Sequence, residues 1–140
     1  RAPYRAGMDG TRIFLAANVL LWLPYGLYCL AAPGFLAEAA GVAAATPTGS
    51  TELRAMYGGL QAAIGLLAFA GMQRADLARP ALITIATLTA GLGVARLLGA
   101  LSDGAWWAFT PATLLITVIV FALYVVNTSM EGVFNPRLRK

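Results

Sequence analysis

The sequence predicts an all-α integral membrane four-helix bundle, and three observations support that fold class. First, 59% of the 140 residues are hydrophobic and only 11% are charged, whereas soluble domains carry about 25% charged residues. Second, four apolar stretches are each long enough to cross a bilayer core, which takes about 20 residues of helix. Third, most Lys and Arg residues lie at the ends of those stretches, as in membrane proteins. We therefore expect one transmembrane domain over residues 1–140.

The four spans and the short segments between them are predicted from apolar runs and local signals. The spans cover approximately residues 12–32, 52–71, 80–100 and 105–126. In the first, Pro24 is expected to cause a kink. Ser50 or Thr51 is the expected N-cap of the second, and Pro80 is expected at the first position of the third.

The connection between spans one and two is long enough for a short element of its own. Residues 35–40 are expected to form a short helix along the membrane surface. Residues 46–50 are then expected to form a turn, because they combine Pro, Gly, Ser and Thr.

Charge sets the expected orientation of the four spans. An even number of spans places both termini on one side. That side would hold eight of the ten basic residues, namely Arg1, Arg5, Arg12, Arg74, Arg79, Arg137, Arg139 and Lys140. Because cytoplasmic loops carry an excess of Lys and Arg, both termini are expected in the cytoplasm.

Composition also excludes several classes of function. The chain has no His and one Cys, Cys29. It therefore lacks the residues for the usual haem ligation, a structural zinc site or a Ser-His-Asp triad. Its basic residues do not gather on one helix with exposed aromatics, which argues against nucleic acid as a partner. We expect no metal site and no catalytic residues.

Charged residues near the outer ends of spans two and three form a candidate site. An unpaired charge inside a membrane span is costly, and such residues usually serve a function. Glu52 is the expected partner of Arg96, and Arg54 and Asp103 form the second expected pair. Such pairs either bind a ligand or hold two helices in register, and the sequence leaves both roles open.

A polar stripe on span two extends this candidate site. Arg54, Tyr57 and Gln61 recur at i, i+3 and i+7, which places them on one face of an α-helix. Polar residues on one face of a membrane helix turn toward the bundle interior or a cavity. They are therefore expected to line a pocket open toward the outer leaflet.

Small residues predict close packing of spans two and three. They repeat every four residues, a spacing that lets two membrane helices approach closely. The residues concerned are Ala55, Gly59 and Ala63 on span two, and Thr87, Gly91, Ala95 and Gly99 on span three. Either stripe could instead dock a partner subunit.

Two other kinds of residue are assigned structural roles. Asn18 lies inside span one and is expected to bridge helices through its amide. Trp22, Trp106 and Trp107 are expected to anchor the chain at the membrane interfaces.

The motifs of spans two and three resemble a known bacterial family. They are ELRAMYGGLQ at residues 52–61, Ile64-Gly65, GLGVARLLG at residues 91–99, and Asp103-Gly104. The family is domain of unknown function 4345, small four-helix membrane proteins. The resemblance implies that fold in a bacterial inner membrane and assigns no chemistry. The four-span plan is more distantly similar to the DoxX-like group, some of whose members serve as small subunits beside oxidoreductases.

Two functions are consistent with these features. The first is a non-catalytic accessory or scaffold subunit of a larger, bioenergetic membrane complex, whose partners are membrane lipids and other membrane-protein subunits. The alternative is a lipid- or quinone-binding protein, or a small enzyme, with a pocket between spans two and three near the outer leaflet. In that case Arg54 or Arg96 would bind an anionic head group or a quinone oxygen, with Glu52 as the counter-charge. Lipid and quinone are the only ligands expected.

Overall fold

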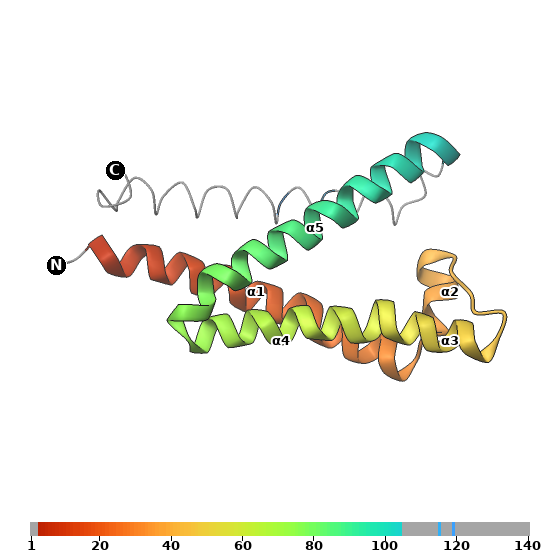
Figure 1. Ribbon diagram of the computed structural model, residues 1–140, viewed down its shortest axis with the longest axis horizontal. Coiled ribbons are helices and arrows are strands. Elements are labelled where there is room, and N and C mark those ends of the chain that lie inside the picture. Colours follow the sequence, from red (N-terminus) through yellow and green to blue (C-terminus); the bar gives the residue numbers. More distant parts are fainter. Residues whose placement is uncertain (1–2, 105–114, 116–118, 120–140) are drawn as a thin grey trace. The chain divides into compact units, whose positions relative to one another are not determined.

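A computed structural model describes residues 3–104 and, beyond them, residues 115 and 119 (Figure 1). All secondary structure among these residues is helical, which confirms the all-α class. The elements are α1 (Pro3–Ala31), α2 (Phe35–Ala40), α3 (Pro47–Leu53), the π-helix η1 (Arg54–Gly59), α4 (Leu60–Gln73) and α5 (Ala75–Asp103). Apart from positions 115 and 119, the predicted fourth span at residues 105–126 lies outside the described residues, as do Trp106 and Trp107.

Three segments of the described part are long and apolar enough to cross a membrane. They are Gly10–Ala31, Pro47–Gln73 and Ala75–Asp103. In the second, α3, η1 and α4 follow one another without a break and form one helical rod. The first three predicted spans are thus present as membrane-compatible helices.

The second span begins earlier than predicted, so the expected N-cap at Ser50 or Thr51 is wrong. Thr46 is the N-cap, with an extended backbone and a side-chain oxygen that accepts from the Gly49 backbone N–H at 3.1 Å. Pro47 occupies the first helical position, where its fixed φ is suitable and its missing N–H costs nothing. The expected turn at residues 46–50 is therefore the first turn of α3.

The third span also begins earlier, so the prediction that Pro80 opens it is wrong. α5 begins at Ala75 and continues through Pro80. Only Arg74 separates α4 from α5; its backbone is extended and its N–H still bonds to the Ala70 carbonyl at 2.9 Å. The Arg74 guanidinium also pairs with Asp76 at 2.8 Å. Pro80 lies past the first turn of α5, so it removes one backbone hydrogen bond from the helix, to the carbonyl of Asp76.

The predicted short helix between the first two spans is confirmed as α2 (Phe35–Ala40). Gly41 ends it with a left-handed backbone, φ 68°, and its N–H bonds to the Leu36 carbonyl. Tyr28 near the end of α1 packs edge to face on Phe35, with ring centroids 5.1 Å apart. This contact holds α2 close to the end of α1, and the Leu36 side chain of α2 is buried.

The chain divides into two compact units, and we describe each separately. The first, which we call the hairpin unit, comprises Leu15–Ala81. The second, the terminal unit, comprises residues 1–14 and 82–140. In the described part of the terminal unit, α5 buries Leu82, Ile85, Ala86 and Thr89, a spacing of i, i+3, i+4 and i+7 that defines one apolar face.

Within the hairpin unit, α1 and the α3–η1–α4 rod run side by side (Figure 1), with glycines where they approach most closely. A Cβ on Gly58 would lie 2.6 Å from the Leu30 side chain and 2.8 Å from its backbone nitrogen. A Cβ on Gly65 would lie 2.7 Å from the backbone nitrogen of Leu23, and one on Gly26 would overlap the backbone of Ala62. Only glycine permits this backbone-to-backbone distance.

Candidate functional site

The π-helix η1 (Arg54–Gly59) contains two residues of the predicted polar cluster, Arg54 and Tyr57, and ends two residues before a third, Gln61. Its backbone bonds run to the fifth residue back, as from the Leu60 N–H to the Ala55 carbonyl. Such wide turns are rare and occur frequently at functional sites. They also change which residues share a face, because an α-helical spacing no longer applies across the segment.

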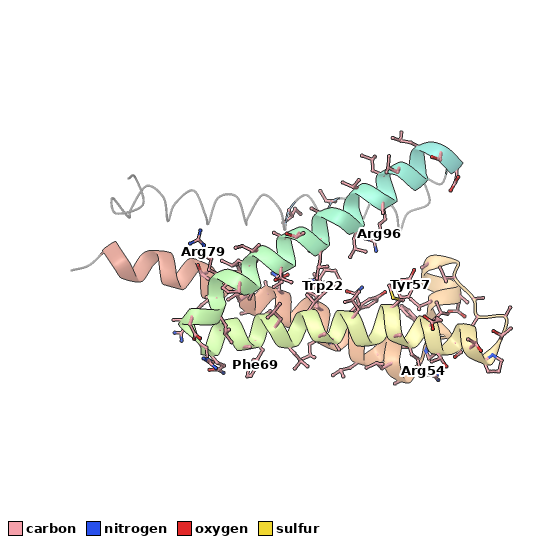
Figure 2. All side chains as sticks on the ribbon, viewed as in Figure 1. Trp22, Arg54, Tyr57, Phe69, Arg79 and Arg96 are labelled. Carbon is pink, nitrogen blue, oxygen red and sulfur yellow. The ribbon has the colours of Figure 1, made fainter. Side chains whose placement is uncertain are left out.

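The three residues of the predicted polar stripe have different environments. Arg54 is exposed, Tyr57 is half-buried and Gln61 is buried. Figure 2 shows Arg54 and Tyr57 leaving opposite edges of the helix in that view. The π-helix explains the difference, since the i, i+3, i+7 rule assumes α-helical geometry throughout. The structure places the three residues on one short segment of helix but in different surroundings.

Arg54 stabilises the end of α1. Its Nε donates to the Leu30 carbonyl at 3.1 Å, and its Nη1 donates to the Ser50 hydroxyl at 3.0 Å. Leu30 is the penultimate residue of α1, and the last four carbonyls of a helix have no partner within the helix. A cation there also interacts favourably with the helix dipole. Arg54 therefore joins the two helices of the hairpin unit.

Gly58 makes this bond geometrically feasible. Because Gly58 has no side chain, Leu30 packs directly on the η1 backbone. Arg54 lies one turn earlier on the same rod and reaches the carbonyl of that residue. The close contact and the hydrogen bond thus depend on the same local geometry.

Gln61 combines burial with an unused hydrogen-bonding atom. Its side chain is 5% exposed. Its Oε1 is buried and has no hydrogen-bond donor among the described residues. Buried polar side-chain atoms usually have a partner, and each exception needs an explanation.

The remaining members of the predicted charge cluster lie on two units. Glu52 is exposed on α3, in the hairpin unit. Arg96 is half-buried on α5, and Asp103 is the exposed last residue of that helix, both in the terminal unit. In each of the predicted pairs, Glu52–Arg96 and Arg54–Asp103, one residue belongs to the hairpin unit and the other to the terminal unit, and both pairs stay predictions.

The predicted packing stripes stay predictions for the same reason. On span two, Ala55 and Ala63 are exposed and Gly59 is half-buried. On α5, Gly91 and Ala95 are exposed and Gly99 is half-buried. The close contacts that the structure shows use a different set of small residues, Gly58, Ala62 and Gly65, and they face α1.

The sequence analysis missed Gly26, Gly58 and Gly65. A signal was present, because Gly58, Ala62 and Gly65 are spaced i, i+4 and i+7 and define a helix face. The neighbouring set at residues 55, 59 and 63 had the same kind of spacing. The sequence pattern alone does not show which of these two adjacent helix faces packs against α1.

Asn18 and Trp22 form a polar contact inside the first span. The Trp22 indole N–H donates to the Asn18 side-chain oxygen at 3.1 Å, across one turn of α1. Asn18 is 3% exposed. The indole donor, expected at the membrane interface, is therefore satisfied within its own helix.

The described part of the chain contains no cluster of side chains that could bind a metal ion. Nowhere among these residues do three His, Cys, Asp or Glu side chains gather where a metal ion could bind. Cys29 is buried and unpaired. What the hairpin unit offers chemically is the guanidinium of Arg54, the half-buried phenol of Tyr57 and the amide of Gln61.

The fold and these residues define a helical protein with membrane-compatible spans and a small polar region in its second long helix. The chain belongs to the family described as Domain of unknown function (DUF4345), whose model matches residues 10–128. No curated protein and no solved structure matches the chain.

Proposed function

We propose that this protein is a non-catalytic accessory or scaffold subunit of a larger complex in a bacterial inner membrane, possessing four spans and cytoplasmic termini. The observation that carries the proposal is the way the hairpin unit uses its polar groups. Arg54 caps α1, and Asn18 and Trp22 bond to each other. These groups stabilise the fold, which is what a structural subunit requires.

The outward surface supports the same role. Only 28–39% of each candidate membrane-spanning window is buried inside the chain. Large apolar side chains are exposed on these helices, among them Leu20, Leu66 and Phe69. The exposed Ala55 and Ala63 would let a partner helix approach closely.

Isolation from the native membrane in a mild detergent tests the proposal. We expect other membrane proteins to co-purify in fixed stoichiometry, detected by native mass spectrometry. Ala63→Leu should weaken the association without lowering thermal stability, because Ala63 is exposed. Ala17→Leu, at an exposed position on α1, is the matched control. A chain that is always monomeric and alone would contradict the subunit role.

A second candidate function is a lipid- or quinone-binding site near the outer leaflet. It is favoured by Arg54, which is exposed and uses only two of its five N–H donors in the bonds described. Arg54 or Arg96 would bind an anionic head group or a quinone oxygen, with Glu52 as the counter-charge. Arg96→Leu should then abolish lipid or quinone binding and leave the bundle folded. If the variant mainly loses stability, Arg96 is structural.

A further inference from the structure

The Gln61 side-chain oxygen is an exception among the buried polar groups of the described chain. The Thr89 hydroxyl donates to the Ile85 carbonyl at 2.6 Å, and the Asn18 oxygen accepts from Trp22. Gln61 Oε1 alone, among the buried side-chain oxygens and nitrogens of this part of the chain, lacks a partner.

The depth of Gln61 makes the missing donor significant. Gln61 lies near the middle of the Pro47–Gln73 segment, about 18 Å from the Gln73 end at 1.5 Å per residue. The hydrocarbon core supplies no water to satisfy polar groups there. A donor for this oxygen must therefore come from the protein or from a molecule dissolved in the membrane.

The residues of α1 that the structure shows against this part of the rod have no side-chain donor. Gly26 of α1, which lies against Gly58 and Ala62 on either side of Gln61, has no side chain. Leu23 and Leu30, which contact the same rod, are apolar. Tyr57, one turn before Gln61, is half-buried and is the nearest hydroxyl in the sequence. The π-helix η1 ends at Gly59, two residues before Gln61, and such segments recur at functional sites.

We propose that Gln61 Oε1 accepts a hydrogen bond from the hydroxyl group of an apolar molecule that enters from the membrane. An acceptor requires a donor, and an apolar body suits the buried Ala62 and Ile64 beside it. An anion does not suit an amide oxygen, which accepts and cannot donate, and within the described hairpin unit the nearest cation in sequence, Arg54, is exposed and bonds to Leu30 and Ser50. This inference is independent of the proposed subunit role.

Two matched pairs of probes test the proposal on the purified full chain in detergent. The pairs are 4-hexylphenol with its methyl ether, and 1-nonanol with its methyl ether. Each ether keeps the apolar body and lacks the donor. In at least one pair, the hydroxyl compound should bind about tenfold more tightly, the ratio that one net hydrogen bond gives.

Three variants test whether Gln61 causes the preference for the hydroxyl compound over its ether. Gln61→Met keeps a side chain of similar length without an amide and should reduce the ratio to about one. Gln73→Met changes the other glutamine of the chain, which is exposed, and should leave the ratio unchanged. Tyr28→Phe, which removes an exposed hydroxyl from α1, should also leave it unchanged.

An infrared measurement on the unmutated protein covers the case in which Gln61→Met fails to fold. With ¹³C-labelled glutamine side-chain carbonyls, only Gln61 and Gln73 contribute. The Gln61 band should move to lower frequency with the hydroxyl probe and stay in place with the ether.

Four outcomes would overturn the proposal. They are no binding by either hydroxyl probe, equal affinity for both members of each pair, selectivity that survives Gln61→Met, and a Gln61 band that is hydrogen-bonded before any probe is added. In the last case, a band shift in Tyr57→Phe identifies Tyr57 as the donor, and its absence means that the donor is a different group or a water molecule.

Discussion

Individual polar residues of the hairpin unit connect or reinforce helices. Arg54 donates to the last turn of α1 and to Ser50 on its own rod, so a charged residue in a candidate membrane segment has a structural use. The Trp22 indole N–H donates to the Asn18 side-chain oxygen within α1. Gln61 differs from both, because its oxygen is buried and has no donor in the described part of the chain.

Replacing Arg54 by Leu should lower stability. The change removes the bonds to the Leu30 carbonyl and the Ser50 hydroxyl, and leaves the end of α1 with an unsatisfied carbonyl. Because the side chain is exposed, we expect a loss of only about 1 kcal/mol in the free energy of unfolding. Thermal or denaturant unfolding in detergent, followed by circular dichroism, measures it. Arg79→Leu, at an exposed position on α5, is the control, and an equal loss there would contradict the capping role.

The Asn18–Trp22 hydrogen bond should be measurable as a coupling energy between the two residues in the free energy of unfolding. Asn18→Ala and Trp22→Phe each remove one side of the 3.1 Å hydrogen bond, so the double variant should lose less stability than the sum of the two. We expect a coupling of about 0.5–1.5 kcal/mol. Strictly additive losses in a double-mutant cycle would show that the bond contributes nothing.

At the scale of elements, the hairpin unit depends on backbone contact between α1 and the α3–η1–α4 rod. Gly26 and Gly65 lie where a side chain would meet the backbone of the other helix, and Gly58 lies against Leu30. In lipid, helices associate through such close packing and through hydrogen bonds, since apolar burial drives association only weakly.

Gly58→Ala should therefore destabilise the hairpin unit. The added methyl group would lie 2.6–2.8 Å from Leu30 atoms, and relieving that overlap would also disturb the Arg54 bond to the Leu30 carbonyl. We expect a loss of about 1–3 kcal/mol, the usual cost of overpacking, in unfolding experiments in detergent. Gly34→Ala is the matched control, because no described atom lies within 4 Å of the added Cβ. Similar behaviour of the two variants would be inconsistent with glycine-mediated contact.

Several elements could be predicted from the sequence for definite physical reasons. Long apolar runs identified the first three spans, and the short apolar stretch after Pro33 identified α2 (Phe35–Ala40). Helix starts were less predictable, because Thr46 and Ser50 are both good caps and only the Thr46 hydroxyl bonds to the Gly49 N–H. The π-helix could not be predicted, since its composition does not differ from that of an α-helix.

The candidate site was predictable in part. Gln61 is notable in sequence as an amide inside an apolar run, and the structure buries it. The bond from Arg54 to the Leu30 carbonyl could not be foreseen. It depends on the contact of Leu30 with Gly58, which is a property of two helices and not of either alone.

At the scale of the whole molecule, the charges predicted to meet lie on different units. Glu52 belongs to the hairpin unit, and Arg96 belongs to the terminal unit. If they pair inside the membrane, each stabilises the charge of the other, and loss of one partner leaves an unpaired charge.

A charge exchange tests this pairing. Glu52→Arg and Arg96→Glu should each destabilise the protein by several kcal/mol, because both place like charges together. The double variant should recover most of the loss, as measured by unfolding in detergent. If the double variant is as unstable as the sum of the single changes, Glu52 and Arg96 are not partners.

The claim on which the other proposals depend is that the three long helices cross a membrane, and side-specific labelling tests it most directly. In a Cys29→Ala background, single cysteines at Thr48, in the first turn of the second span, and at Asp76, just after its end, are treated with a membrane-impermeant maleimide in spheroplasts of an expressing bacterium. We predict that Thr48→Cys is labelled in intact spheroplasts and that Asp76→Cys is labelled only after permeabilisation. Labelling of both positions from the same side would contradict the account.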